Sequence, residues 1–517
     1  MKYINIIVFL LFESILGHRL KCGGETKMKN NHKEEGIINY SDKRKLDNEF
    51  VPMKIKVDYT QLKIDLKHKP YYFEVIQESL NQAVHYFELL LSIQHIPASP
   101  ISHKYYEEYC YIDNVDPNCE DWLYDYDLIV FPLFVKTTEE ESLFASASSC
   151  ISSTFNPRPM AGRIEIYDVF DFKKNNIKAF LQTVLFHEMT HILVFTPRLI
   201  RIFGGIREID LNGEKRQAIS SPKVLEIARL HFGCPTLQGV PLEDQGGDGS
   251  AGSHWDGRYM LGDYMVSTSY NENTISDITL ALFEDSGWYK VNYYTGGLFK
   301  FGKGAGCEFF EKDCIINEKT QFPNEFCHKV FEPKCLNSHL GYGECFIGSY
   351  KDSDEEIPIR NQYFKKKHLG GLYITNYCPV SEPYYNNESR EKFYYENNCR
   401  YGDTQGLFQH FGEVIGPQSM CFESSLLPRY SPQRHKWRSI CYKMECDTEN
   451  KNIIVYVDDL NITCPFSGGV LEKIKGFKGK INCPSYYTMC TSDIWCNDMF
   501  ECIDKKSVTD ISIYDKK

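Results

Sequence analysis

Apolar residues recur every three or four positions in two long stretches of the chain, residues 71–93 and residues 177–195. Side chains with this spacing gather on one face of a helix. We therefore expect a long helix in each stretch, with its apolar face packed against a core.

Three other stretches carry strand patterns. Residues 50–66 alternate apolar and polar side chains, whereas residues 126–135 and residues 160–169 contain short apolar runs. Alternation predicts a half-buried strand, and a short apolar run predicts a buried one. The resulting order of strand, helix, strand, strand and helix predicts an α+β or α/β core with a mixed sheet.

The two ends of the chain carry little that could enter this core. Residues 1–17 have the layout of a secretory signal peptide, with an N-terminal anchor or a first core helix as the alternatives. Residues 18–50 are mostly polar and charged, which is typical of a pro-segment or linker. The last residues contain no hydrophobic tail, so we expect a soluble, secreted mature chain without a transmembrane span.

Composition narrows the class of protein. The chain has 517 residues, of which 42% are hydrophobic, and this allows two to four domains with sizeable cores. Its formal net charge is -12, and no dense stripe of Lys and Arg is visible along the sequence. We therefore expect no nucleic-acid partner.

Cysteines are concentrated in the C-terminal part, where 15 of the 20 fall between Cys307 and Cys502. Their irregular spacing in a polar region favours a disulfide-rich domain formed in an oxidising compartment over zinc ribbons, which would need CxxC pairs. Three sequons, at Asn39, Asn387 and Asn461, are candidate N-glycosylation sites and fit the same route.

The second predicted helix contains the sequence LQTVLFHEMTHILVF, residues 181–195. His187 and His191 are four residues apart, so they project from the same side of a helix and can bind one Zn²⁺. Glu188 is offset from that pair, where it can reach a water on the metal and act as its general base. The alternative is a buried helix whose histidines bond to backbone groups.

A third ligand would separate these alternatives. The compact metzincin pattern requires Gly and His where the chain has Val194 and Pro197, so that version fails. Glu208, 17 residues after His191, could serve as the ligand of a gluzincin, but its surroundings favour a solvated loop carboxylate. Among the remaining candidates are His231 and His254.

Residues 231–270, HFGCPTLQGVPLEDQGGDGSAGSHWDGRYMLGDYMVSTSY, resemble the signature of the leishmanolysin family of zinc endopeptidases. These are metzincins in which a long insertion separates the second and third zinc histidines. The matching third histidine is His254, and Met265 matches the methionine turn beneath the metal, with Met260 as the alternative. Further segments resemble the family in the same order, from about residue 50 onward.

The resemblance implies an α+β fold with a metzincin-like catalytic core of mixed sheet and zinc helix, an inserted central domain and a disulfide-rich C-terminal domain. We expect the catalytic subdomain at 51–198, the central subdomain at 199–300 and the Cys-rich domain at 301–517.

The implied function is a secreted zinc-dependent endopeptidase that cleaves proteins or peptides with one Zn²⁺ per chain. Cell-surface or matrix proteins are further candidate partners, and association with a membrane surface is a further expectation. The alternative is a catalytically silent adhesion or binding protein on the same fold.

Three details follow from the same resemblance. Val194 replaces a glycine that helps the chain turn after the zinc helix, so we expect this helix to end differently, near the Thr196–Pro197 step. Cys22 is the candidate pro-segment switch on the metal, although pairing of all 20 cysteines is the alternative. Residues 162–167 should form a strand edge at the rim of the cleft, or else an ordinary core strand.

Overall fold

The computed structural model describes residues 49–95, 100–137, 143–153, 156–173, 177–247, 249–267, 273–293, 299–351, 356–383, 398–400, 410–434 and 436–490, together with the backbone of 21–23 and 36–38. The expected signal peptide, Asn39 and Asn387 lie outside these residues. Within them, the helices lack the combination of length and apolarity that crossing a membrane requires.

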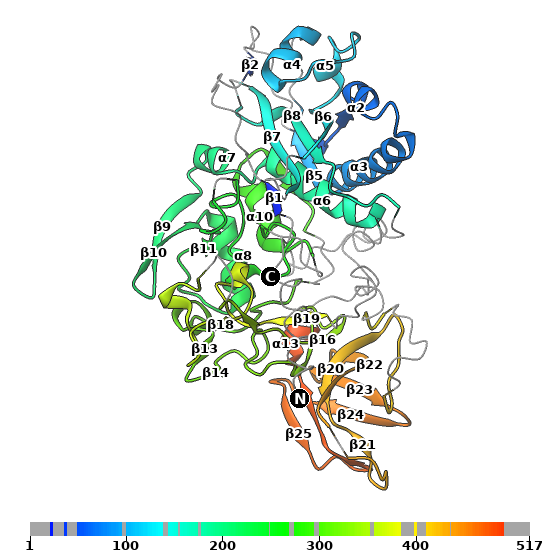
Figure 1. Ribbon diagram of the computed structural model, residues 1–517, viewed down its shortest axis with the longest axis vertical. Coiled ribbons are helices and arrows are strands. Elements are labelled where there is room, and N and C mark those ends of the chain that lie inside the picture. The colour runs from blue at the N-terminus through cyan, green and yellow to red at the C-terminus, as the bar shows by residue number, and fades with distance from the viewer. Residues whose placement is uncertain are drawn as a thin grey trace.

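The N-terminal part of the chain is built on a mixed sheet (Figure 1). Its strand order is β1-β7-β8-β6-β4, and β2 also pairs with β7. Only the pairing of β7 with β8 is antiparallel among these described strands. The bounds are β1 Lys21–Gly23, β2 Gly36–Ile38, β4 Ile55–Val57, β6 Leu128–Val135, β7 Leu143–Ser153 and β8 Pro159–Tyr167.

Both predicted long helices are present and pack against each other. They are α3, Pro70–Leu90, and α6, Ile177–Leu193. The ring of Phe87 on α3 stacks on that of Phe186 on α6, with centroids 4.1 Å apart. On α6, every side chain from Val184 to Leu193 is buried, so this half of the helix is not amphipathic as the spacing suggests but enclosed on all sides.

The prediction of one strand over residues 50–66 is wrong. Two short strands, β3 Phe50–Pro52 and β4, are followed by helix α2, Thr60–Asp65. Asp58 makes the change, because its Oδ1 accepts hydrogen bonds from the Thr60 backbone N–H at 2.9 Å and from the Thr60 hydroxyl at 2.6 Å. This local side-chain bond begins a turn where the alternation alone predicts more strand.

Residues 162–167 do not form a sheet edge. They belong to β8, which lies between β7 and β6 and is mostly buried. The expected edge position is therefore wrong, and the core-strand alternative holds. The strand beside it, β7, escapes prediction because its sequence LFASASSCISS has small polar residues where a buried strand usually has large apolar ones.

The middle of the chain packs below this sheet in the view of Figure 1 and supplies β12, which pairs with β5 in a separate three-stranded sheet. Strand β5 also pairs with β3. The first elements of this region are α7 Pro197–Ile202, β9 Ile206–Leu211, β10 Glu214–Ile219 and α8 Pro222–Phe232. The others are β11 Val240–Pro241, α9 Gly257–Met260, α10 Asp277–Asp285 and β12 Tyr289–Val291, while earlier elements are β5 Leu91–Gln94, α4 His103–Cys110 and α5 Trp122–Asp125.

Short strands joined by turns follow, and then an antiparallel sheet of order β24-β23-β22-β20-β27-β25. The short elements are α11 Glu308–Glu311, β13 Ile315–Ile316, β14 Lys319–Thr320, β15 Pro333–Cys335, β16 Tyr342–Cys345, β17 Gly348–Ser349, η1 Ile359–Asn361, β18 Leu369–Gly370, η2 Tyr373–Thr375 and β19 Ser381–Pro383. The last elements are β20 Ser419–Ser424, β21 Leu427–Pro428, β22 Arg438–Asp447, β23 Asn452–Val457, β24 Leu460–Cys464, β25 Gly469–Glu472, β26 Phe477–Lys478, β27 Lys480–Cys483 and α13 Tyr486–Met489.

Disulfides stabilise this C-terminal part. Eight bonds join cysteines among the described residues, and six of them lie wholly within residues 301–517. The Cys234–Cys307 bond connects the middle of the chain to the C-terminal part. Cross-links of this kind restrict the unfolded chain, which suits a region of short strands with few long elements. The disulfide-rich character expected from sequence is confirmed.

Helix α6 and strand β8 approach each other closely at Gly162 and Ile192. A Cβ added to Gly162 on β8 would lie 2.4 Å from Cγ2 of Ile192 on α6. Glycine at this position therefore lets the helix lie directly on the strand.

We predict that Gly162→Ala lowers the free energy of unfolding by about 1–3 kcal/mol, because helix and strand must separate. Gly416→Ala is the matched control, since a Cβ there would meet no atom within 4 Å. Denaturant unfolding of both variants measures the difference, and equal stability of the two would contradict the close packing.

Candidate metal centre

Three histidines meet at one point in the protein interior. The Nε2 atom of His187 lies 3.0 Å from that of His191 and 3.2 Å from that of His254, and the remaining pair is also 3.2 Å apart. His187 and His191 are one turn apart on α6, while His254 comes from the loop between β11 and α9. All three side chains are buried.

The other nitrogen of each ring faces a backbone carbonyl. Nδ1 lies 2.6 Å from the Tyr264 oxygen for His187, 2.8 Å from the Phe195 oxygen for His191 and 3.1 Å from the Ser250 oxygen for His254. A carbonyl oxygen can only accept, so Nδ1 carries the proton in each ring and Nε2 keeps a lone pair. The three lone pairs therefore point at one another.

This donor set fits a zinc ion. Zn–N bonds of about 2.0–2.1 Å at tetrahedral angles place ligand nitrogens about 3.3 Å apart, close to the separations here. Burial lowers the pKa of His191 to about 4, and it also lowers those of His187 and His254. Neutral imidazoles are the form that binds metal. Among the described residues, these three form a His, Cys, Asp or Glu group close enough to share an ion.

Glu188 lies beside the first of these histidines on α6. Both of its carboxylate oxygens are buried, and neither has a hydrogen-bond partner among the described residues. Burial raises the pKa of this carboxyl well above its usual value. An unpaired buried carboxylate is costly, and a water on a metal held by the neighbouring histidines would give Glu188 a partner.

The turn after α6 differs from the sequence expectation. The helix ends at Leu193, and Thr196 caps the next helix, α7, by accepting a hydrogen bond from the Leu199 backbone N–H at 3.2 Å. The expected helix end at the Thr196–Pro197 step is therefore wrong. Val194 keeps negative φ, because the Thr190 carbonyl accepts bonds from both Val194 and Phe195 and closes the turn without a glycine.

The segment expected to form the methionine turn lies against the same histidines. Tyr264 supplies the carbonyl that holds His187, and its hydroxyl lies 2.9 Å from the Thr190 hydroxyl on α6. The Met265 backbone N–H donates to Asp263, and its carbonyl accepts from Trp255. Met265 and Met260 are both fully buried in the core.

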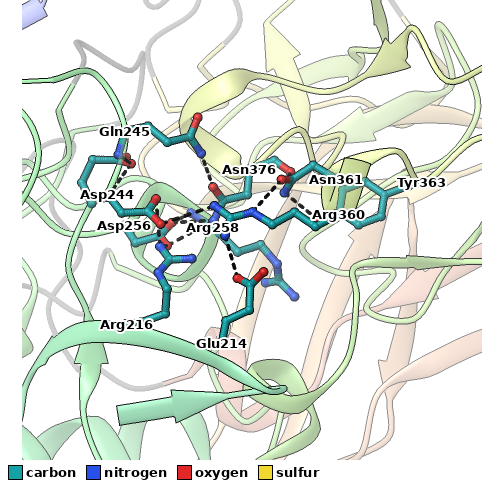
Figure 2. A network of polar contacts seen from close by, with 11 residues as sticks. Glu214, Arg216, Asp244, Gln245, Asp256, Arg258, Arg360, Asn361, Tyr363 and Asn376 are labelled. Atoms are coloured by element: carbon teal, nitrogen blue, oxygen red, sulfur yellow. Dashed lines mark hydrogen bonds and ion pairs between the residues drawn. The ribbon is translucent and has the colours of Figure 1, made fainter. Parts of the chain in front are cut away.

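The loop that carries His254 is held by a buried network of polar side chains. Asp256, two residues beyond His254, lies 2.6 Å from the Arg216 guanidinium on β10, and both its oxygens accept from Asn376, at 3.2 and 3.3 Å. Figure 2 shows these side chains converging from three parts of the chain. The loop is thereby fixed between the β9–β10 hairpin and the C-terminal part.

The network extends outward through Asp244 and Arg360. Asp244 pairs with Arg216 at 3.1 Å and with Arg360 at 3.4 Å, and Arg360 also pairs with Glu214 at 2.9 Å (Figure 2). Sequence reasoning missed all of these residues. They are spread over more than 150 positions, and no motif joins them, so only the folded chain reveals the connection.

Neither Glu208 nor His231 belongs to the three-histidine group. Glu208 is an exposed residue of β9 that pairs with Lys215 at 2.7 Å, so it is solvated as expected but lies on a strand rather than in a loop. His231, on α8, bonds to the Phe301 carbonyl. Cys22 lies in β1, whose backbone pairs with β7. Asn461 is exposed on β24.

We predict that Arg216→Ala lowers the free energy of unfolding by about 3 kcal/mol, because Asp256 would stay buried without its guanidinium partner. Lys215→Ala is the control, since this neighbour is exposed. Thermal and urea unfolding compare the two variants. An Arg216→Ala protein as stable as the control would show that the network does not hold the loop.

Comparison with known proteins also points to a metallopeptidase. Residues 108–496 match the family model described as leishmanolysin. The leishmanolysin homolog of Crithidia fasciculata is 29% identical over 329 residues, covering 60% of this chain and 47% of that protein. The leishmanolysin of Leishmania major is 26% identical over 382 residues, covering 70% and 60% respectively.

The leishmanolysin-like peptidase of Drosophila melanogaster is 29% identical over 302 residues, covering 52% of this chain and 43% of the relative. The matches thus cover about half the length of these curated relatives. Because the family model extends over most of the chain and includes the helix and the loop that bring the three histidines together, the protein belongs to the leishmanolysin family of metallopeptidases.

Proposed function

We propose that the protein is a zinc-dependent metalloendopeptidase that hydrolyses peptide bonds of proteins. The observation that carries the proposal is the convergence of three buried, neutral imidazoles with Glu188 beside them. His187, His191 and His254 are the proposed ligands of one Zn²⁺. A zinc ion held there supplies polarisation of the scissile carbonyl and activation of water.

The protein's own residues transfer one proton and hold the three imidazoles in place. Glu188 takes the proton of the attacking water as a C–O bond forms at the scissile carbon, and it delivers that proton to the amine nitrogen as the C–N bond breaks. Its lack of any other partner among the described residues leaves both oxygens available for this role. The carbonyls of Tyr264, Phe195 and Ser250 hold the imidazoles in the tautomer that binds metal.

Met265 is the proposed residue of the methionine turn. Its neighbour Tyr264 orients His187, and Asp263 fixes the turn by accepting from the Met265 N–H at 2.7 Å. The turn therefore supports the ligand through the backbone, and the Met265 side chain adds buried packing without binding the metal.

Secretion is part of the same proposal. Eight disulfides require an oxidising compartment, and Asn461 with Thr463 forms an exposed sequon on β24. Asn39 and Asn387 are proposed as further glycosylation sites. Residues 1–17 are the proposed signal peptide, and cell-surface or matrix proteins are proposed as further partners.

Cysteine parity supports a switch role for Cys22 in the proposed pro-segment, residues 18–50. Among the described residues, sixteen of the chain's 20 cysteines are paired, and Cys119 is free and buried. The remainder is odd in number, so at least one of Cys22, Cys496 and Cys502 has no partner within the chain.

The proposed subdomains that follow residues 18–50 are the catalytic subdomain at 51–198, the central subdomain at 199–300 and the Cys-rich domain at 301–517.

We predict that Glu188→Gln retains zinc and loses turnover of casein by about 10²–10⁴-fold, because glutamine cannot take the proton. Glu208→Gln, which removes an exposed carboxylate from β9, should leave both unchanged. Metal analysis and casein cleavage on the same preparations test this. Full activity of Glu188→Gln would contradict its role as base, and loss of zinc would make it a ligand.

We also predict that His254→Ala folds but no longer retains zinc, because two imidazoles on one helix turn leave the site without its third nitrogen. His231→Ala removes a buried histidine outside the group and should keep its zinc. Metal content after gel filtration, with circular dichroism as the folding check, distinguishes the two. Stoichiometric zinc in folded His254→Ala protein would overturn the ligand assignment.

A further inference from the structure

Two short segments near the C-terminus carry an excess of positive charge. Residues 429–438 contain four Arg or Lys residues, and residues 472–480 contain four lysines and one carboxylate, Glu472. The whole chain has a net charge of -12, so this basic surface, defined by the two segments, is opposite in sign to the protein as a whole.

Folding brings the segments together across 33 intervening residues. Strand β21 pairs with β26, and the Arg429 backbone N–H donates to the Gly476 carbonyl at 2.9 Å. The Lys478 ammonium donates to the carbonyls of Ser431 and Gln433, at 2.7 Å each, and so fastens one segment onto the other. Because neither segment is dense enough alone, the sequence shows no basic stripe.

Most of these charges face solvent without a partner. Lys480 pairs with Glu472. Within the described residues, no ion pair is formed by six other exposed cations, which are Arg429, Arg434, Lys436, Arg438, Lys473 and Lys475. Some exposed lysines elsewhere, such as Lys178 and Lys312, have acidic partners. Six unpaired like charges repel one another, so their clustering suits an anionic ligand more than stability.

The surface also has a hollow with an aromatic wall. The hollow has a volume of about 390 Å³. It is lined by Trp437, Ser425, Gly479, Lys473 and the Glu472–Lys480 pair. Nearby in sequence, Tyr430 is 94% exposed. Aromatic rings next to cations can receive the face of a sugar ring while the cations bind its charged substituents.

We propose that the basic surface binds a linear sulfated polysaccharide, with sulfate groups against the Arg and Lys side chains and a sugar face against Trp437. Among the described residues of the two segments, Tyr430 is the only large apolar side chain that is strongly exposed, which is too little for insertion into a bilayer. The secretory route proposed above places the protein where such polysaccharides occur and nucleic acids do not. The inference does not depend on catalysis.

The basic surface lies away from the three-histidine site. It lies around β21 and β25 near the lower end of the molecule in Figure 1, whereas α6 lies in the upper half. A polysaccharide held there tethers the peptidase and leaves the three-histidine site free.

The test measures binding of the full-length protein to immobilised heparin by surface plasmon resonance at about 0.15 M salt. We expect the triple variant Arg434→Glu, Lys436→Glu, Lys473→Glu to weaken binding roughly tenfold or more, and added salt to weaken wild-type binding steeply. The matched control is Lys365→Glu, Lys366→Glu, Lys367→Glu, which makes the same charge change on another exposed segment and should stay within about twofold. Circular dichroism checks that both variants fold.

Three further probes distinguish the ligand class. Desulfated heparin should not bind, and vesicles with phosphatidylserine and single-stranded poly(dT) should bind more weakly than heparin. The proposal is overturned if wild type ignores heparin, if both triple variants weaken equally, if desulfated heparin binds as well, or if either vesicles or poly(dT) bind more tightly. Because the readout is binding, an inactive but heparin-binding protein would refute the proposed catalysis alone.

Discussion

The arrangement of three imidazole lone pairs at one buried point is the constraint on which the rest of this structure depends. Two of the rings are fixed by a single helix turn, since His187 and His191 lie four residues apart on α6. The third arrives 63 residues later from a loop, and a loop has no intrinsic geometry that could aim a ring to within a fraction of an ångström. Contacts from other parts of the fold therefore have to hold the loop that carries His254.

That support has two physical components. One is local, because each Nδ1–H is bound by a backbone carbonyl, so the tautomer and orientation of every ring are set before any metal is present. The other is long-range, because Asp256 forms an ion pair with Arg216 and accepts hydrogen bonds from Asn376, which come from separate parts of the chain. Burying this ion pair is costly, and its several hydrogen bonds offset that cost. The C-terminal part thus contributes to the site without supplying a ligand.

The sequence predicted those features that depend on local periodicity and failed where tertiary contacts decide. The spacing of apolar residues located α3 and α6, and the HExxH pattern placed two histidines on one face. The third histidine required the resemblance to leishmanolysins, because the loops, helices and strands between His191 and His254 set no fixed spacing between the two residues. Hydrogen bonds to the Asp58 side chain begin a turn where alternation predicted more strand, and the carbonyl of Thr190 closes the turn at Val194 without a glycine. The network around Asp256 left no trace in sequence, since its members meet only in the folded chain.

The central claim is that the three histidines hold a zinc ion that the protein uses to cut peptide bonds. The decisive measurement is the metal content of purified protein without residues 1–50, combined with casein cleavage before and after chelation. We expect one zinc per chain, cleavage that stops when the chelator removes the zinc, and recovery when zinc is returned. Folded protein without zinc, or cleavage that continues at full rate after zinc is removed, would contradict it.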